Sequence, residues 1–112
     1  MMYGEAEKIR VRLAQLEGVK AVTRGWPRHL SALPCIAVTK AADTPVDFRD
    51  DRSRLTELEF YVRVFAEQTA RAEEIAAAAE AAMEEMGYTR TFACDEDEDE
   101  VRIAAMRCRK IV

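Results

Sequence analysis

Between residues 55 and 87 the hydrophobic and polar positions change from one regular pattern to another. From Leu58 to Ala66 they alternate, with Phe65 as an apolar exception, which is typical of a β-strand with one buried face. After Gln68 the apolar residues recur at helical spacing and form one stripe. The residues of this stripe are Ala72, Ile75, Ala79, Ala82, Met83 and Met86. The pattern predicts a long strand followed by an alanine-rich helix, with Thr69 as its N-cap and Gly87 just beyond its C-terminus.

Shorter patterns predict one further helix and four further strands. The helix is expected at residues 4–15, and the strands are expected at residues 19–24, 34–40, 88–94 and 101–112. Along the fourth of the five strands, one side is expected to carry Tyr88, Arg90, Phe92 and Cys94. The order α-β-β-β-α-β-β favours an α+β fold, in which one mixed or antiparallel sheet has both helices packed on one face. Residues 1–112 are enough for a single domain with its own core.

Residues 41–54 show no hydrophobic period and are rich in aspartate and arginine. A segment of this length without a period is long for a connection inside a compact domain, and such segments often carry function. We therefore predict a mobile loop that orders against a partner, with Val46 and Phe48 as its apolar anchors. The residues assigned to this assembly loop are Asp43, Val46, Phe48, Arg49 and Arg52.

The last two predicted strands are separated by an unbroken acidic run: Asp95, Glu96, Asp97, Glu98, Asp99 and Glu100. Like charges repel and stay hydrated, so this run is expected to form a solvated hairpin tip. Carboxylates can also bind a hard cation such as Ca²⁺ or Mg²⁺, but the run lacks the spaced ligands and the glycine of an EF-hand loop. Two alternatives remain open, namely a small module that binds a cation or a peptide at this hairpin, and a negatively charged functional surface.

Composition and charge narrow the class of protein. The net charge is −4, and 49% of the residues are hydrophobic, as in ordinary soluble domains. Residues 1–40 carry a net charge of +4, whereas residues 55–94 carry −5. This segregation disfavours nucleic acid as a partner and would let the basic surface of one copy meet the acidic surface of another. We expect no membrane span and no signal peptide, and we expect reduced core thiols at Cys35, Cys94 and Cys108.

No residue pattern indicates catalysis. The sole histidine, His29, has no Ser, Cys or Asp at a motif spacing, and the four glycines form no phosphate-binding loop. Glu73 and Glu74 are adjacent, and placement in the first helical turn explains them better than paired acid–base chemistry does. Trp26 is expected to close one end of the core, and a ligand platform is the alternative. We therefore expect a non-enzymatic protein with no catalytic residue, no cofactor and no metal site.

The strands predicted at residues 55–66 and 101–112 are long for a domain of this size. About twelve residues at about 3.3 Å each span roughly 40 Å, whereas the chain length implies a body about 35 Å across. Strand ends that extend beyond the body leave backbone groups without partners and favour contact with a neighbour. On the last strand, Arg107, Arg109 and Lys110 could face acidic groups of an adjacent copy, and a head-to-tail contact of this kind closes a ring or grows a filament.

A set of short motifs follows the same order as these elements. Residues 59–66 (EFYVRVFA) lead into a helix that contains residues 72–75 (AEEI), and then come residues 86–90 (MGYTR), the acidic turn and residues 106–109 (MRCR). This arrangement resembles the small tail terminator, or tail completion, proteins of long-tailed bacteriophages and prophages. The N-terminal helix and residues 34–38 (PCIAV) fit the same plan, so the likeness covers nearly the whole chain.

The resemblance implies an α+β minor tail protein, a structural subunit that is monomeric before assembly and caps the tail tube as a hexameric ring. Such a ring stops polymerisation of the tube and makes the surface to which the head docks, with tail-tube and head-completion proteins as partners. Assembly would take place in the cytoplasm of the bacterial host, and the protein would end in the virion tail. Residues 43–54 would match a flexible loop that engages neighbours, and the acidic tip could line a lumen through which DNA slides. A head–tail connector or neck protein is the nearest alternative.

Overall fold

The computed structural model of the protein describes residues 3–27, 32–45 and 55–112. The elements of these residues are α1 (Tyr3–Leu13), β1 (Ala21–Arg24), β2 (Cys35–Pro45), β3 (Thr56–Ala66), α2 (Thr69–Glu85), β4 (Thr89–Asp95) and β5 (Arg102–Ile111). The strands form one sheet in the order β1-β2-β3-β5-β4, in which β1 and β2 are parallel and all other neighbours are antiparallel. The predicted α+β class and the predicted order of elements are confirmed.

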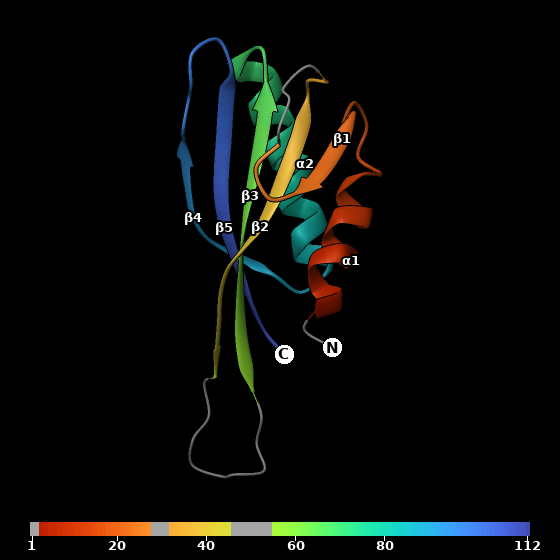
Figure 1. Cartoon of the computed structure of the whole chain (residues 1–112), viewed down its shortest axis with the longest axis vertical. Helices are drawn as coiled ribbons and strands as arrows, with labels where there is room; N and C mark the ends of the chain where they lie inside the picture. The colour runs from red at the N-terminus through yellow and green to blue at the C-terminus, as the bar shows by residue number, and fades with distance from the viewer. Residues whose placement is uncertain (1–2, 28–31, 46–54) are drawn as a thin grey trace.

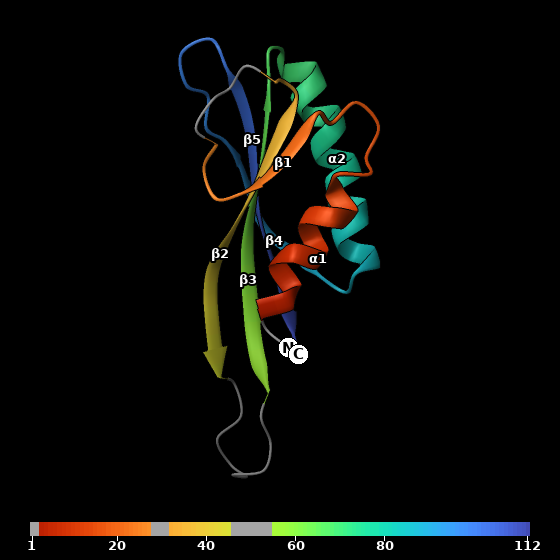
Figure 2. The same ribbon diagram turned by 45° about the vertical axis from the view of Figure 1, so that its right-hand side comes forward.

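Both helices cover the same face of the sheet (Figure 1, Figure 2). α1 packs on β1 and β2, whereas α2 packs mainly on β3 and β5. No helix of the described residues covers the opposite face, which we call the open face. The two helices therefore divide the sheet between them, and β4 lies at the edge beside α2.

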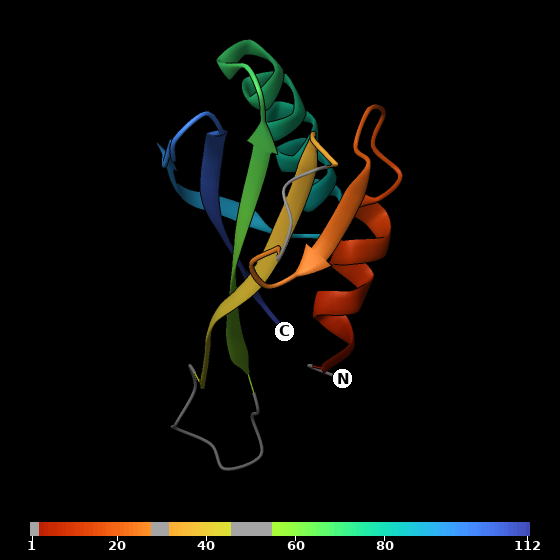
Figure 3. The same ribbon diagram turned by 45° about the horizontal axis from the view of Figure 1, so that its top comes forward.

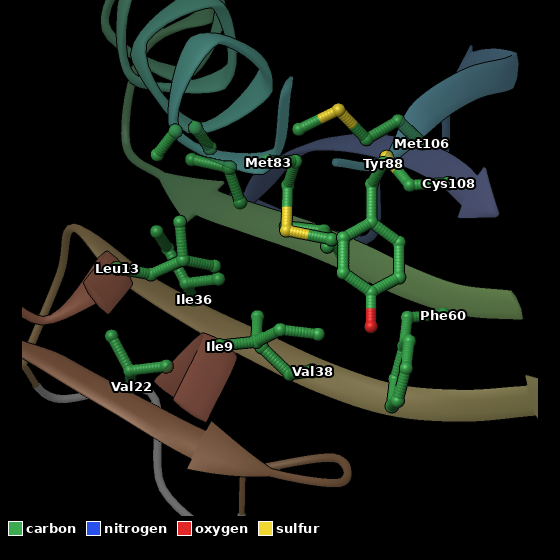
Figure 4. Close-up of a cluster of buried hydrophobic side chains, with 14 of the residues drawn as sticks. Ile9, Leu13, Val22, Ile36, Val38, Phe60, Met83, Tyr88, Met106 and Cys108 are labelled. Carbon is green, nitrogen blue, oxygen red and sulfur yellow. The ribbon is translucent and has the colours of Figure 1, made fainter. Parts of the chain in front are cut away.

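The main core lies between the sheet and the helices (Figure 4). The alternation along β3 places Leu58, Phe60, Val62 and Val64 on this side, and all four side chains are fully buried. The remaining large side chains of this core are Ile9, Leu13, Ile36, Val38, Ile75, Met83, Tyr88 and Met106. The strand and the helix predicted from the two hydrophobic periods are thus confirmed.

The open face has a small apolar cluster of its own. Phe65, the exception in the alternation, packs there with Cys35, Ala37 and Ile103. Trp26, in the connection that follows β1, lies edge-on to Phe65 with 5.4 Å between the ring centroids. Trp26 remains 53% exposed. The prediction that it closes one end of the main core is wrong, because it covers part of the second cluster on the other side of the sheet.

The C-terminus of α2 is closed by a glycine motif, as predicted. Gly87 has a φ of +91°, a conformation that an L-residue rarely adopts. The backbone N–H of Gly87 donates to Glu84 at 2.9 Å, and that of Tyr88 donates to Met83 at 2.9 Å. These are the two bonds of a Schellman motif, which reverses the chain and directs Tyr88 into the core.

α2 begins one residue earlier than predicted. Gln68 is the N-cap, with an extended backbone, and its carbonyl accepts the N–H of Ala72 at 3.0 Å. Thr69 is already the first helical residue, and the first turn contains no acidic residue. The assignments of Thr69 as N-cap and of Glu73 and Glu74 to the first turn are therefore wrong.

Two strand assignments also differ from prediction. β2 continues to Pro45, so the loop predicted at residues 41–54 is wrong for residues 41–45. These residues show no hydrophobic period because nearly all of their side chains are exposed, and pairing with β3 holds them extended. In β4 a bulge separates Arg90, which pairs with Cys108, from Phe92, which pairs with Arg107. The extra residue turns Phe92 to the open face, so Arg90 and Phe92 do not share a side.

Candidate functional site

The β2–β3 hairpin extends beyond the layer of helices (Figure 2). We call its outer part, residues 41–45 of β2 and 56–59 of β3, the arm. β5 follows β3 into this region, since Thr56 and Val112 exchange backbone hydrogen bonds of 2.9 and 2.8 Å. The resulting body measures 50 × 24 × 23 Å along its principal axes. β3 and β5 both continue into this region, as predicted for the strands at residues 55–66 and 101–112. The predicted unpaired end of the first of these strands is wrong, because β3 is paired there with β2 on one side and with β5 on the other.

One edge of β2 has no neighbouring strand along the arm. β1 pairs with β2 only from Cys35 to Val38. Within the described residues, β2 is therefore bordered by β3 alone from Ala41 to Pro45. Backbone N–H and C=O groups along such an edge can pair with a strand of another chain. The arm is thus a candidate contact surface.

The predicted assembly loop falls only partly on the arm. Asp43 lies in β2, is exposed, and its Oδ2 is 3.2 Å from Nζ of Lys40. The other four residues assigned to the loop, Val46, Phe48, Arg49 and Arg52, lie outside the described residues, as do the remaining residues of 46–54. Their part in assembly stays a prediction.

The acidic run joins β4 to β5, as the predicted hairpin requires. Arg63 donates from Nε to Oε1 of Glu96 at 2.8 Å, and Arg102 donates from Nη1 to Oδ2 of Asp97 at 3.1 Å. Residues 98–100 are exposed. Cations of the sheet thus hold two of the six carboxylates, which lowers the repulsion within the turn and gives it a defined path.

The three basic residues of β5 do not share one face. Arg107 and Arg109 lie on the open face, where Arg107 Nε is 3.7 Å from Glu59 and Arg109 Nη1 is 3.1 Å from Glu57. Lys110 lies on the helix side, 3.7 Å from a carboxylate of α1. Each cation already has a carboxylate of its own chain nearby. Contact with an adjacent copy stays a prediction and would have to share these partners.

The open face carries a row of stacked arginine and aromatic side chains. Arg63 lies 5.1 Å from the ring centroid of Trp26 and 4.6 Å from that of Tyr61. Arg107 lies 4.8 Å from the same Tyr61 ring and donates a hydrogen bond to its hydroxyl. Phe92, at the edge of this face, is 51% exposed. Arginine and aromatic residues are enriched in protein–protein interfaces, so this row is a second candidate contact surface.

The row was not expected from the sequence. The alternation along β3 places Tyr61 and Arg63 on one face, and this was the only signal available. Arg107 reaches Tyr61 because β5 pairs with β3, and Trp26 reaches Arg63 through the connection after β1. Neither neighbour is close in sequence, so hydrophobic period alone could not find them.

The titratable groups give no sign of a nucleophile. The three cysteines are free and lie on strands, as expected. Burial raises the pKa of Cys35, and it raises the pKa of Cys108 to about 11, so both thiols stay protonated at neutral pH. His29 lies outside the described residues. In the described ranges, no group of three or more His, Cys, Asp or Glu side chains is placed to hold a metal ion.

Comparison with known proteins assigns no family. The chain matches no protein-family model and no curated protein. Among the helices that the structure describes, none is long and apolar enough to cross a membrane. The contact surfaces themselves therefore carry the functional argument.

Proposed function

We propose that this protein is a structural subunit of virion assembly, of the tail terminator type found in long-tailed phages and prophages. It assembles in the cytoplasm of a bacterial host, caps the tail tube as a ring, and provides the surface to which the head docks. Its partners are further copies of itself, the tail-tube protein and a head-completion protein. It performs no catalysis in this role.

The arm is the observation that supports this proposal most directly. A strand that extends past its neighbour leaves backbone groups unpaired, and proteins normally cover or disrupt such edges. Here β2 has one such edge from Ala41 to Pro45 within the described residues, in a body about twice as long as it is wide. A subunit of a ring or tube has a use for this edge, because a neighbouring subunit covers it on assembly.

The open face supports the same class of function. The row formed by Trp26, Arg63, Tyr61 and Arg107 extends across the open face, and Tyr61 and Arg107 also line a hollow of about 490 Å³ there. Aromatic and arginine side chains are enriched in protein–protein interfaces, where they supply much of the binding energy.

The test is to locate the protein on tails. Purified tail-tube protein would be polymerised with and without this protein, and gold-labelled protein would be located by electron microscopy. We expect shorter tubes with label at one end only, and in whole particles we expect the label between the tail tube and the head. Label along the length of the tubes, or no effect on their length, would contradict the proposal. Label at the portal of tail-less heads would indicate the connector or neck role.

A matched pair of variants tests the arm. Ala42→Arg places a large cation in the arm, at a half-buried position next to the unpaired edge, and we expect it to abolish capping. Ala78→Arg makes the same change on the exposed side of α2 and should leave capping intact. Circular dichroism confirms that both variants are folded. Equal capping by the two variants would show that the arm makes no contact.

A further inference from the structure

Charge is separated between the two edges of the sheet. The order of strands places β1 at one edge and β4 at the other (Figure 1, Figure 3). We call residues 3–24, which include α1 and β1, the basic flank; they carry five cations and three carboxylates, a net charge of +2. We call residues 67–100, which include α2 and β4, the acidic flank; they carry twelve carboxylates and two arginines, a net charge of −10.

A groove runs along the acidic flank between α2 and the sheet. Its volume is about 390 Å³, and small or apolar side chains line its floor, namely Ala76, Ala77, Ala93, Ala104 and Met106. The groove forms because β4 continues the sheet beyond the part that α2 covers. Three carboxylates and one guanidinium stand around it, namely Glu73, Glu80, Asp95 and Arg90, of which Glu80 and Arg90 form an ion pair of 3.2 Å.

The basic flank presents a matching surface. Val11 of α1 is 45% exposed and is the apolar side chain on the outer side of this helix. Lys8 lies one turn before Val11 on the same exposed side, and Arg24 is exposed at the end of the adjacent strand β1. An apolar side chain flanked by cations therefore complements an apolar floor flanked by carboxylates.

The outer edge of β4 is a weaker candidate than the groove. The bulge between Arg90 and Phe92 interrupts its ladder, and the acidic run follows it directly. Bulges and charged residues are the devices by which proteins prevent strand addition at an edge. The groove lies inside this edge, and the side chains of its floor are apolar or small.

We propose that the groove between α2 and β4 is the docking site for α1 of a second copy of this chain, with Val11 on the alanine floor. Lys8 and Arg24 of that copy lie against the carboxylates of the rim. Because donor and acceptor surfaces lie on opposite edges of one chain, each copy uses both, and the contact is head-to-tail. Repetition of one such contact closes a ring or grows a filament. The proposed function requires the ring, so the inference rests on that function and names the surfaces that would form the ring.

Charge reversal on the two sides tests the contact. The rim variant is Glu73→Lys with Asp95→Lys, and the flank variant is Lys8→Glu with Arg24→Glu. Within the described residues none of these four side chains forms an ion pair of 4 Å or less, although Lys8 and Arg24 interact over longer distances with Glu5 and Glu7. We therefore expect both variants to fold. Each variant alone should self-associate at least about tenfold more weakly than wild type, because like charges then meet. An equimolar mixture should recover association, since both contacts become complementary again. Sedimentation velocity measures all three samples.

The control keeps the charge change and moves it away from the groove. Glu98→Lys with Glu100→Lys alters net charge as much as the rim variant does, in the turn beyond β4. It should weaken association less than the rim variant does, because both residues belong to the acidic flank but lie away from the groove. Ala77→Trp, which fills the groove without changing charge, should weaken association, whereas Ala78→Trp, one residue on, should not.

Several outcomes would overturn the inference. These are a rim variant that associates like wild type, a control that weakens equally, a mixture that fails to recover, and a wild type that stays monomeric at every concentration. The proposed function is judged separately, by the location of the protein on tails. If the charge-reversal variants still cap tails, the proposed function is supported and the groove contact is contradicted. If the mixture of variants recovers association but the protein never binds tails, the groove contact is supported and the proposed function is contradicted.

Discussion

At the scale of single residues, Tyr88 links α1, β3 and β5 through its hydroxyl group and its ring. It donates a hydrogen bond of 2.7 Å to Oε1 of Glu5 in α1, and Nζ of Lys110 in β5 lies 3.7 Å from the same oxygen. Its ring packs edge-on against Phe60 with 5.8 Å between centroids. Burial and the neighbouring Glu5 carboxylate raise the pKa of Tyr88, so the phenol stays protonated and remains a donor. This contact ties the start of α1 to the last strand.

Tyr88→Phe should remove the hydroxyl and keep the ring. We expect the free energy of unfolding to fall by about 1–2 kcal/mol, because a hydrogen bond to a carboxylate is lost in a largely covered site. Tyr61→Phe is the control, since its hydroxyl lies on the open face, and it should lose less than about 1 kcal/mol. Urea unfolding followed by circular dichroism measures both. Equal losses would show that the Glu5 contact adds nothing specific.

The same variant should change the pH dependence of stability. Burial alone would raise the pKa of Glu5, but the hydrogen bond from Tyr88 and the charge of Lys110 outweigh it and lower the pKa below 4.5. A carboxyl with a lowered folded-state pKa stabilises the fold above its ordinary pKa and loses this contribution as pH falls below it. Wild type and Tyr88→Phe should therefore differ most near neutral pH and converge on acidification, as unfolding measured across that range would show. A difference in the free energy of unfolding between the two proteins that grows on acidification would contradict this role of Glu5.

At the scale of elements, hydrophobic period predicts the elements that pack on the main core, and strand pairing decides the rest. The hydrophobic periods of β3 and α2 predict both elements correctly, because each has one face on the main core. Residues 41–45 have no such face, and only their pairing with β3 makes them a strand. The bulge in β4 likewise follows from its pairing with β5, so the sequence pattern placed Phe92 on the wrong side.

Substitution of Gly87 tests its role at the C-terminus of α2. Gly87→Ala should lower the free energy of unfolding by about 1–2 kcal/mol, because an L-residue is strained at a φ of +91°. The new Cβ would also lie 3.3 Å from Cε of Lys110. Gly4→Ala is the matched control: it lies in α1 with nothing within 4 Å of the new Cβ, and alanine favours a helix. Thermal unfolding should show a lower melting temperature for Gly87→Ala and no decrease for Gly4→Ala.

At the scale of the whole molecule, shape and charge act together. The body is 50 Å long with an unpaired strand edge along its arm, and its two flanks carry net charges of +2 and −10. Such a distribution favours association of unlike edges over association of like edges. A head-to-tail arrangement follows from it more readily than a two-fold dimer does, since a two-fold contact between acidic flanks would bring like charges together.

Association should therefore weaken as salt screens the two flanks. Between about 50 mM and about 500 mM NaCl we expect the dissociation constant of self-association to rise at least about tenfold, since the Debye length falls well below the size of the flanks. Sedimentation equilibrium at a series of salt concentrations measures it, with circular dichroism as the check that the fold is unchanged. Association that is insensitive to salt, or strengthened by it, would point to an apolar contact instead.

The sequence by itself determined the elements that have one buried face. Its two hydrophobic periods specify β3 and α2, its glycine at 87 specifies the end of the helix, and its blocks of charge specify two flanks of opposite sign. These features are local, because period, cap and net charge depend on residues close together in the chain.

Only the tertiary structure decided which distant residues meet. Pairing of β5 with β3 brings Arg107 to Tyr61, the strand order places the two charged flanks at opposite edges, and the position of α2 leaves a groove beside β4. The physical reason is that strand partners are chosen by contacts across the whole sheet. The residues next to a side chain in sequence therefore do not indicate which strand it will face.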